Sequence, residues 1–123
     1  MSTVLIVEDN EKNMKLVRDV LRVKGYETLE AVTAEDGIRL ALERRPDLIL
    51  MDIHLPGMNG IEARGVLRAD AATADIPVIA VTASVMQQDR KKITEAGFEG
   101  YVGKPINLKE FLAAVQAMLE RQR

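Results

Sequence analysis

Short apolar runs alternate with longer amphipathic segments along the whole chain, and this alternation limits the possible folds more than any other feature. The apolar runs predict strands at 4–7, 26–30, 48–51, 76–81 and 100–102. The amphipathic segments predict helices at 11–24, from 33 to before Pro46, at 61–70, at 86–96 and from 107 onward. Five strand–helix units in strict alternation indicate an α/β fold, in which helices cover both faces of a parallel sheet.

Helix start and stop signals support these boundaries. Gly25 and Gly97 follow amphipathic segments and are typical of helix ends, and Thr33 is a typical cap at a helix start. Asn107 followed by Glu110 resembles a capping box, which predicts the start of the last helix.

The composition of the strands predicts their order. The strands at 4–7, 48–51 and 76–81 are apolar throughout, as central parallel strands are. The strand at 26–30 alternates and the strand at 100–102 is short, so both suit the edges of the sheet. This pattern favours the order 2-1-3-4-5, in which function gathers beyond the carboxyl ends of the strands, near the first and third.

Composition narrows the class of protein. The 123 residues predict one domain, residues 1–123, because they are too few for two cores. The net charge of −2 without a basic block argues against nucleic acid or an anionic membrane as the main partner. There is no cysteine, which excludes disulfides and thiol catalysis. The chain lacks a signal-like start and a membrane-length apolar run, so we expect a cytoplasmic location.

Polar residues follow four of the five predicted strands. They are Glu8 and Asp9 after the first, Asp52 after the third, Thr82 after the fourth and Lys104 after the fifth. Each alone fits a helix cap, a turn or a solvated surface position as well as it fits a functional site. Together they predict one pocket, because the carboxyl ends of parallel strands meet at one edge of the sheet.

The chemistry of this predicted pocket favours phosphoryl transfer. Three carboxylates repel one another, and we expect them to raise one another's pKa unless a cation lies among them. An all-oxygen site suits Mg²⁺, which also takes phosphate oxygens, and Lys104 supplies a second positive charge. Asp52, the central carboxylate, is then the predicted nucleophile, and the product is an aspartyl phosphate.

Four sequence segments carry a resemblance to a known family. VLIVEDN, LILMDIHLPGMNG, PVIAVTA and GYVGKPI, in this order and spacing, resemble the receiver (CheY-like) domain of two-component response regulators over the full length of the chain. The sequence most resembles those of single-domain regulators and of the receivers of hybrid kinases. The resemblance implies a flavodoxin-like (βα)5 three-layer sandwich; the receiver CheY is itself a known example of the strand order given above.

The resemblance also implies a role for each residue of the predicted site. It makes Asp52 the phosphorylation site, and Asp9, Asp52 and the backbone carbonyl of His54 the direct ligands of Mg²⁺. Glu8 acts on the metal through a bound water molecule, and Lys104 binds a phosphoryl oxygen.

The remaining expectations concern the switch. Thr82 resembles the switch hydroxyl, and Tyr101 resembles the aromatic residue that turns inward on activation. The Lys104–Pro105 peptide bond is expected to be cis.

The expected partners are proteins. A histidine kinase or a histidine phosphotransfer protein donates the phosphoryl group, and a downstream protein docks on the face formed by the fourth helix, the fifth strand and the fifth helix. We expect a monomer or a weak dimer that acts as a signalling domain rather than an enzyme. The residues on or near the docking face are Met86, Lys91, Tyr101, Ile106 and Lys109.

The sequence is also compatible with other functions. The chain is interpreted as a stand-alone receiver, but it also fits a receiver segment of a larger regulator or hybrid kinase, or an unphosphorylated docking module. A haloacid dehalogenase-type phosphatase normally has a second Asp two residues after the nucleophile, where this chain has His54. A nucleotide-binding flavodoxin-like protein is disfavoured, because the loop EDNEKN is acidic and lacks glycine.

Overall fold

A five-stranded parallel sheet forms the centre of the computed structural model, which describes residues 2–83 and 87–121, the side chains of 87–89 excepted. The strands are β1 (Thr3–Val7), β2 (Glu27–Ala31), β3 (Leu48–Asp52), β4 (Val78–Thr82) and β5 (Gly100–Gly103). Their order is β2-β1-β3-β4-β5, which confirms the predicted topology. Met86, one of the predicted docking residues, lies outside the described part of the chain.

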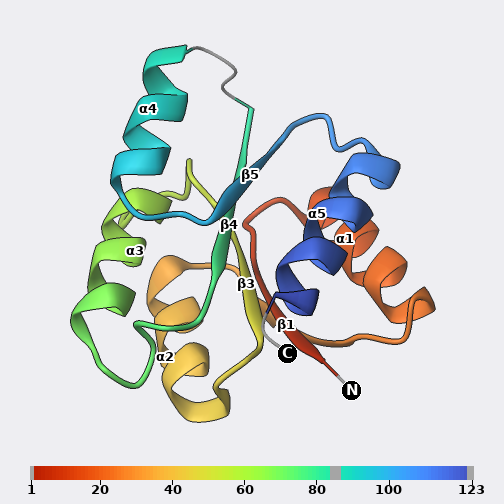
Figure 1. The fold of residues 1–123 in the computed structure, drawn as a ribbon, viewed down its shortest axis with the longest axis horizontal. Coiled ribbons are helices and arrows are strands. Elements are labelled where there is room, and N and C mark those ends of the chain that lie inside the picture. Colours follow the sequence, from red (N-terminus) through yellow and green to blue (C-terminus); the bar gives the residue numbers. More distant parts are fainter. Residues whose placement is uncertain (1, 84–86, 122–123) are drawn as a thin grey trace.

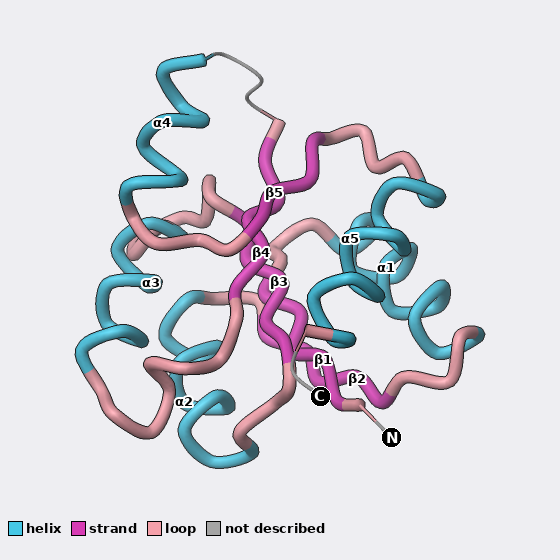
Figure 2. The backbone as a smooth tube through the Cα atoms, viewed as in Figure 1, coloured by secondary structure: helices cyan, strands magenta, loops and turns pink. Residues whose placement is uncertain are grey.

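In the described part of the chain, five helices cover the sheet in two layers. They are α1 (Glu11–Val23), α2 (Ala34–Arg44), α3 (Gly60–Ala69), α4 (Gln87–Glu95) and α5 (Leu108–Glu120). Figure 1 shows α1 and α5 on one side of the sheet and α2, α3 and α4 on the other. Figure 2 shows the strands nearly edge-on between these layers, so the predicted three-layer sandwich is confirmed.

Each layer has its own hydrophobic core against one face of the sheet. Strand side chains alternate between faces, so Leu5, Ile49 and Met51 pack on the α2–α3–α4 side. The apolar residues next to them in the same strands pack on the α1–α5 side. The central strands β3 and β4 are buried along their whole length, as the apolar runs predicted. On the other side, α5 buries Phe111, Val115, Met118 and Leu119, spaced by three or four residues.

Two strands begin later in the chain than predicted, for reasons that lie in backbone hydrogen bonding. The N–H of Tyr26 donates to Leu21 O at the end of α1, so Tyr26 belongs to the turn and β2 begins at Glu27. β4 begins at Val78 because Pro77, which precedes it, has no N–H to donate to a neighbouring strand.

The predicted caps are present at two helix starts. The side chain of Thr33 accepts from Asp36 N, and that of Asn107 accepts from Glu110 N, which is one half of the predicted capping box. A complete capping box lies at the start of α3, where Asn59 and Glu62 bond to each other's backbone N–H at 2.9 and 3.2 Å.

Within residues 2–83 and 87–121, no helix combines the length and the hydrophobicity that a transmembrane span requires.

Candidate functional site

The strand register brings the predicted polar residues to one edge of the sheet. Val7 pairs with Met51 and Asp52 pairs with Val81, so Glu8, Asp52 and Thr82 follow or end neighbouring strands at nearly the same height. Each of these strands is apolar up to its last residue, and this fixes the polar residue that follows at the boundary between core and solvent.

Glu8, Asp9 and Asp52 form an acidic cluster. One carboxylate oxygen of each lies within 4.8 Å of the others. Glu8 and Asp52 are each 4% exposed, whereas Asp9 is exposed to solvent. The prediction that these three residues meet is confirmed. The unusual feature of the cluster is that two of its three carboxylates are buried.

Lys104 supplies the positive charge that a buried pair of carboxylates needs. Its Nζ lies 2.9 Å from Glu8 Oε1 and 3.2 Å from Asp52 Oδ2. The backbone of Lys104 is fixed as well, because its N–H donates to Thr82 O at 2.8 Å, directly after the Thr82–Gly103 pair. The peptide bond to Pro105 is cis, as expected.

Two backbone N–H groups hold the carboxylates in place. His54 N donates to Asp52 Oδ1 at 3.0 Å, and Asn10 N donates to Glu8 Oε2 at 3.2 Å. Asp52 therefore has one oxygen on an amide and the other on an ammonium group. Hydrogen bonds to both oxygens fix the orientation of the carboxylate. The role of Asn10 was not predicted, since a backbone donor leaves no signal in the side-chain sequence.

Burial and crowding shift the two carboxylates in opposite directions. Burial, together with a hydrogen bond to Asp52, raises the pKa of Glu8 to about 7. Burial also acts to raise the pKa of Asp52, but hydrogen bonds from Glu8 and His54 N–H and the charge of Lys104 outweigh it and hold this pKa below its ordinary value. The prediction that the carboxylates raise one another's pKa is thus correct for Glu8 and wrong for Asp52.

The loop from β3 to α3 folds back so closely on the end of β3 that it requires a glycine. The N–H of Gly60 donates to Ile53 O at 3.0 Å. A Cβ at position 60 would lie 2.9 Å from Ile53 Cα and would overlap the carbonyl oxygen of Asp52. Together with the capping box, this contact fixes the backbone that follows Asp52.

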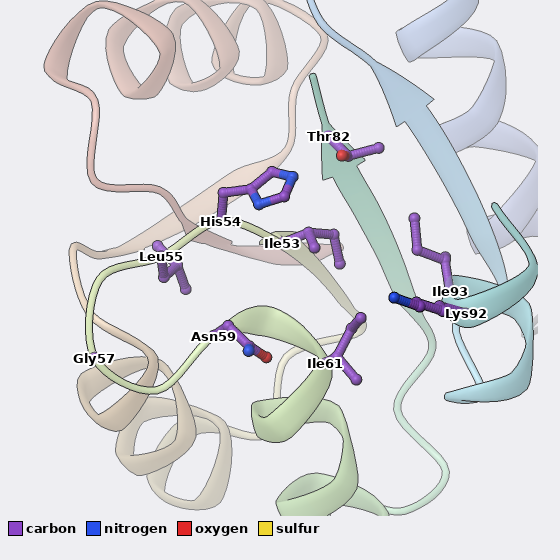
Figure 3. A pocket seen from close by; sticks show the side chains of 9 residues that line it. All are labelled: Ile53, His54, Leu55, Gly57, Asn59, Ile61, Thr82, Lys92 and Ile93. Carbon is purple, nitrogen blue, oxygen red and sulfur yellow. The ribbon is translucent and has the colours of Figure 1, made fainter. Parts of the chain in front are cut away.

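A cavity of about 400 Å³ lies beside the cluster, between this loop and α4. Figure 3 shows the side chain of His54 in this cavity, with its ring directed towards the end of β4, where Thr82 lies. Thr82 is 1% exposed. The imidazole therefore faces the cavity, while the backbone of His54 faces Asp52 through the N–H described above.

The donor set of the acidic cluster fits a hard divalent cation. All three side chains offer carboxylate oxygens, the ligands that Mg²⁺ prefers. Burial is the main cause of the raised pKa of Glu8, so its charged form is poorly solvated, and a bound cation would stabilise that form.

A family comparison identifies this arrangement. The model of the response regulator receiver domain matches residues 4–116. The chain belongs to this family. As a receiver, it is a signalling domain of two-component systems, as its four sequence segments indicated.

Individual relatives agree with the family. The receiver is 46% identical to the polar-differentiation response regulator DivK of Brucella anthropi over 117 residues, which cover 95% of each chain. A receiver domain of a sensor histidine kinase from Pseudomonas aeruginosa PAO1 is 33% identical with a TM-score of 0.90, over 97% of this chain and 98% of that one. That structure has a magnesium ion coordinated in its active site cleft. A CheY-like receiver from Methanospirillum hungatei is 27% identical with a TM-score of 0.91, over 99% and 96% of the chains.

Some predicted residues of the receiver lie away from the acidic cluster. Tyr101 is half-buried on β5, and the Cζ of Arg90 lies 4.9 Å from the centre of its ring. Among the predicted docking residues, Lys91 and Lys109 are exposed and Ile106 is half-buried. Arg90 was not predicted, because a contact between α4 and β5 has no local sequence pattern.

Proposed function

We propose that the receiver accepts a phosphoryl group on Asp52 from a phosphohistidine of a histidine kinase or a histidine phosphotransfer protein. The observation that carries this proposal is the placement of Asp52 in contact with Lys104 and beside two further carboxylates. The whole chain, residues 1–123, acts as one receiver domain, either alone or within a larger regulator or hybrid kinase.

Asp52 is suited to be the nucleophile. Its lowered pKa keeps it ionised at neutral pH, and His54 N and Lys104 Nζ fix the direction of its two oxygens. Fixed orientation lowers the entropic cost of in-line attack. Since little covalent chemistry is required of the protein in phosphoryl transfer, positioning and charge stabilisation account for most of the effect.

Lys104 acts on the transferred group. Its ammonium is bound to Glu8 and Asp52 in this structure, so it lies where a phosphoryl group attached to Asp52 places new negative charge. Nearby negative charge raises the pKa of Lys104 against the opposing effect of burial, so the group remains charged.

The cation would be held by Asp9, Asp52 and the carbonyl of His54, with Glu8 acting through a water molecule. When bound, Mg²⁺ supplies charge neutralisation on the phosphoryl oxygens. This assignment rests on the acidic cluster and on the likeness to the Pseudomonas aeruginosa receiver that binds magnesium.

The signal is a change in protein–protein binding. Thr82 moves to hydrogen-bond the new phosphoryl group, Tyr101 turns inward, and the face formed by α4, β5 and α5 changes its affinity for a downstream protein. The receiver acts in the cytoplasm as a monomer or weak dimer, without nucleic acid or membrane as a partner.

The test is phosphorylation followed by intact mass. The protein, with Mg²⁺ and a phosphohistidine donor or a small phosphodonor, is expected to gain one phosphoryl group that is lost in base. Asp52→Asn should abolish the gain, and Asp75→Asn, at an exposed site, should retain it. Full labelling of Asp52→Asn would refute the assignment, and no labelling of the wild type by a competent donor would favour an unphosphorylated docking module.

Lys104→Ala tests the second role. We expect it to slow phosphorylation or to uncouple it from partner binding, because the phosphoryl charge loses its cation. Lys24→Ala, which removes an exposed charge at the end of α1, is the matched control. Wild-type behaviour of Lys104→Ala in both measurements would reduce Lys104 to a structural ion pair.

A further inference from the structure

A small pocket lies between α4 and β5, on the face that we assign to signal output. Its volume is about 270 Å³. Ile93 and Phe98 are buried and form an apolar floor, and the ring of Tyr101 forms one wall. We call this the Arg90–Tyr101 pocket; its lining consists of Arg90, Ile93, Thr94, Phe98, Glu99, Gly100 and Tyr101.

Arg90 places a positive charge on the rim of this pocket. Its guanidinium stacks on the ring of Tyr101, with Cζ 4.9 Å from the ring centre, and its side chain is otherwise exposed. The ion pairs among the described side chains do not include Arg90. Among the described side chains, the charge is therefore met by an aromatic face and not by a carboxylate.

Glu99, on the same rim, does not offset this charge. Its two carboxylate oxygens accept from Arg64 Nη2 at 3.1 and 3.3 Å, and Oε1 also accepts from Val78 N at 2.8 Å. Arg64 is 2% exposed and burial lowers the pKa of its guanidinium, yet an arginine remains charged. Glu99 thus serves as the counter-ion of a buried arginine, and among the described lining residues no other carboxylate balances the charge of Arg90.

The Tyr101 ring connects this pocket to the acceptor site. Tyr101 pairs with Ala80 in the register of β4 and β5, and Gly103, two residues further on, pairs with Thr82. A ring that leaves its present position also leaves the guanidinium of Arg90. An exposed cation–π contact and an exposed ion pair are of similar strength, so Arg90 can exchange one for the other at little cost.

We infer that the Arg90–Tyr101 pocket docks a segment of a partner protein that presents an apolar side chain next to a carboxylate. The apolar side chain packs on Ile93 and Phe98, and the carboxylate pairs with Arg90. Docking strengthens when Tyr101 turns inward, because its ring then releases the guanidinium of Arg90 and leaves more space in the pocket. The dependence on activation rests on the function proposed above, whereas the chemistry of the docked segment does not.

The stack can be tested in the absence of a partner. The Nε–Hε resonance of Arg90 in an NMR spectrum should show an upfield ring-current shift in the resting protein and lose it in Tyr101→Leu. Tyr101→Phe, which keeps the ring, should retain it. Phosphorylation should shift the resonance towards the value in Tyr101→Leu. An unchanged resonance in Tyr101→Leu overturns the stack, and an unchanged resonance in fully phosphorylated protein overturns its link to activation.

The chemistry of docking can be tested with three helical peptides that differ at one position. Each carries one leucine, flanked by Glu in the first peptide, by Gln in the second and by Lys in the third. We expect the phosphorylated receiver to bind the Glu peptide about fivefold more tightly than the Gln peptide, and the Lys peptide least. Arg90→Gln should remove this preference. Arg44→Gln, the same substitution at an exposed arginine of α2 that does not line the pocket, should retain it.

Each outcome of the peptide experiment decides the inference. Absence of measurable binding of the Glu peptide, equal affinity for the Glu and Gln peptides, or an equal loss in Arg44→Gln and Arg90→Gln would overturn it. Phosphorylation of Asp52 is measured separately by mass. An Arg90-dependent preference in a protein that cannot be phosphorylated would therefore leave the docking chemistry standing and refute the proposed function.

Discussion

The acidic edge of the sheet and the outer face of the α4–β5 region hold their charges in different ways. At the acidic edge, Glu8 and Asp52 are buried, and each bonds to Lys104 and to a backbone N–H. On the outer face, Arg90 is exposed and has one aromatic contact. The first arrangement is specified by several interactions at once, whereas the second depends on one weak contact.

This difference matches the two functions that we propose for these regions. The chemistry that we propose at Asp52 needs a fixed geometry, which strongly coupled buried charges and hydrogen bonds provide. A surface that responds to that chemistry needs the opposite, because a small free energy can shift only an equilibrium whose states differ by a few kcal/mol. The inner side of the same region is anchored by the Arg64–Glu99 ion pair, so only its outer face is free to respond.

Gly60→Ala should have the largest effect on stability, about 3 kcal/mol, because a Cβ would overlap the backbone at Asp52 and Ile53. Urea unfolding measures it. The matched control is Gly65→Ala in the same helix, where a Cβ meets nothing within 4 Å and should add about 0.5–1 kcal/mol of stability. Equal effects of the two substitutions would show that the backbone at the acidic edge is less constrained than the contact implies.

Glu8 should make the metal-free protein less stable as pH rises. Folded Glu8 has a pKa of about 7 and unfolded Glu8 a pKa near 4.5, so the folded state binds more protons between these values. The free energy of unfolding should therefore fall from about pH 4.5 to about pH 7, on the order of 2 kcal/mol. Thermal unfolding of Glu8→Gln across this range should lack this fall, and a persistent slope in the variant would assign it to other groups.

Arg90→Gln should have the smallest effect on the free energy of unfolding, below about 1 kcal/mol, since an exposed cation–π contact contributes little. Urea unfolding with Lys91→Gln as control measures it. A loss of several kcal/mol would contradict the comparison, because it would make the outer face as firmly held as the acidic edge.

Sequence patterns predicted most of the fold and the composition of the site. Apolar runs gave the strands and their order, and the residue after each run gave Glu8, Asp9, Asp52 and Lys104, because parallel strands end at a common edge. What they could not supply is pairing between residues distant in the chain. Arg64 is a buried charge in α3, and its partner Glu99 lies 35 residues away in the chain.

The opposite shifts of Glu8 and Asp52 were equally beyond the sequence. Both residues are carboxylates at the ends of apolar strands, and each bonds to Lys104 and to a backbone N–H. They differ in the distances to these partners and in the direction of their shared hydrogen bond, which Glu8 donates and Asp52 accepts. Such differences of a few ångströms appear only when the side chains are placed in space.

The raised pKa of Glu8 also affects the net charge of the native molecule. A group with a pKa of about 7 is half-protonated at neutral pH, so the metal-free folded chain carries roughly half a negative charge fewer than its formal −2. The unfolded chain, with Glu8 ionised, carries the full value. Electrophoretic mobility of the native protein near neutral pH therefore depends on the protonation of a buried side chain as well as on the exposed charges.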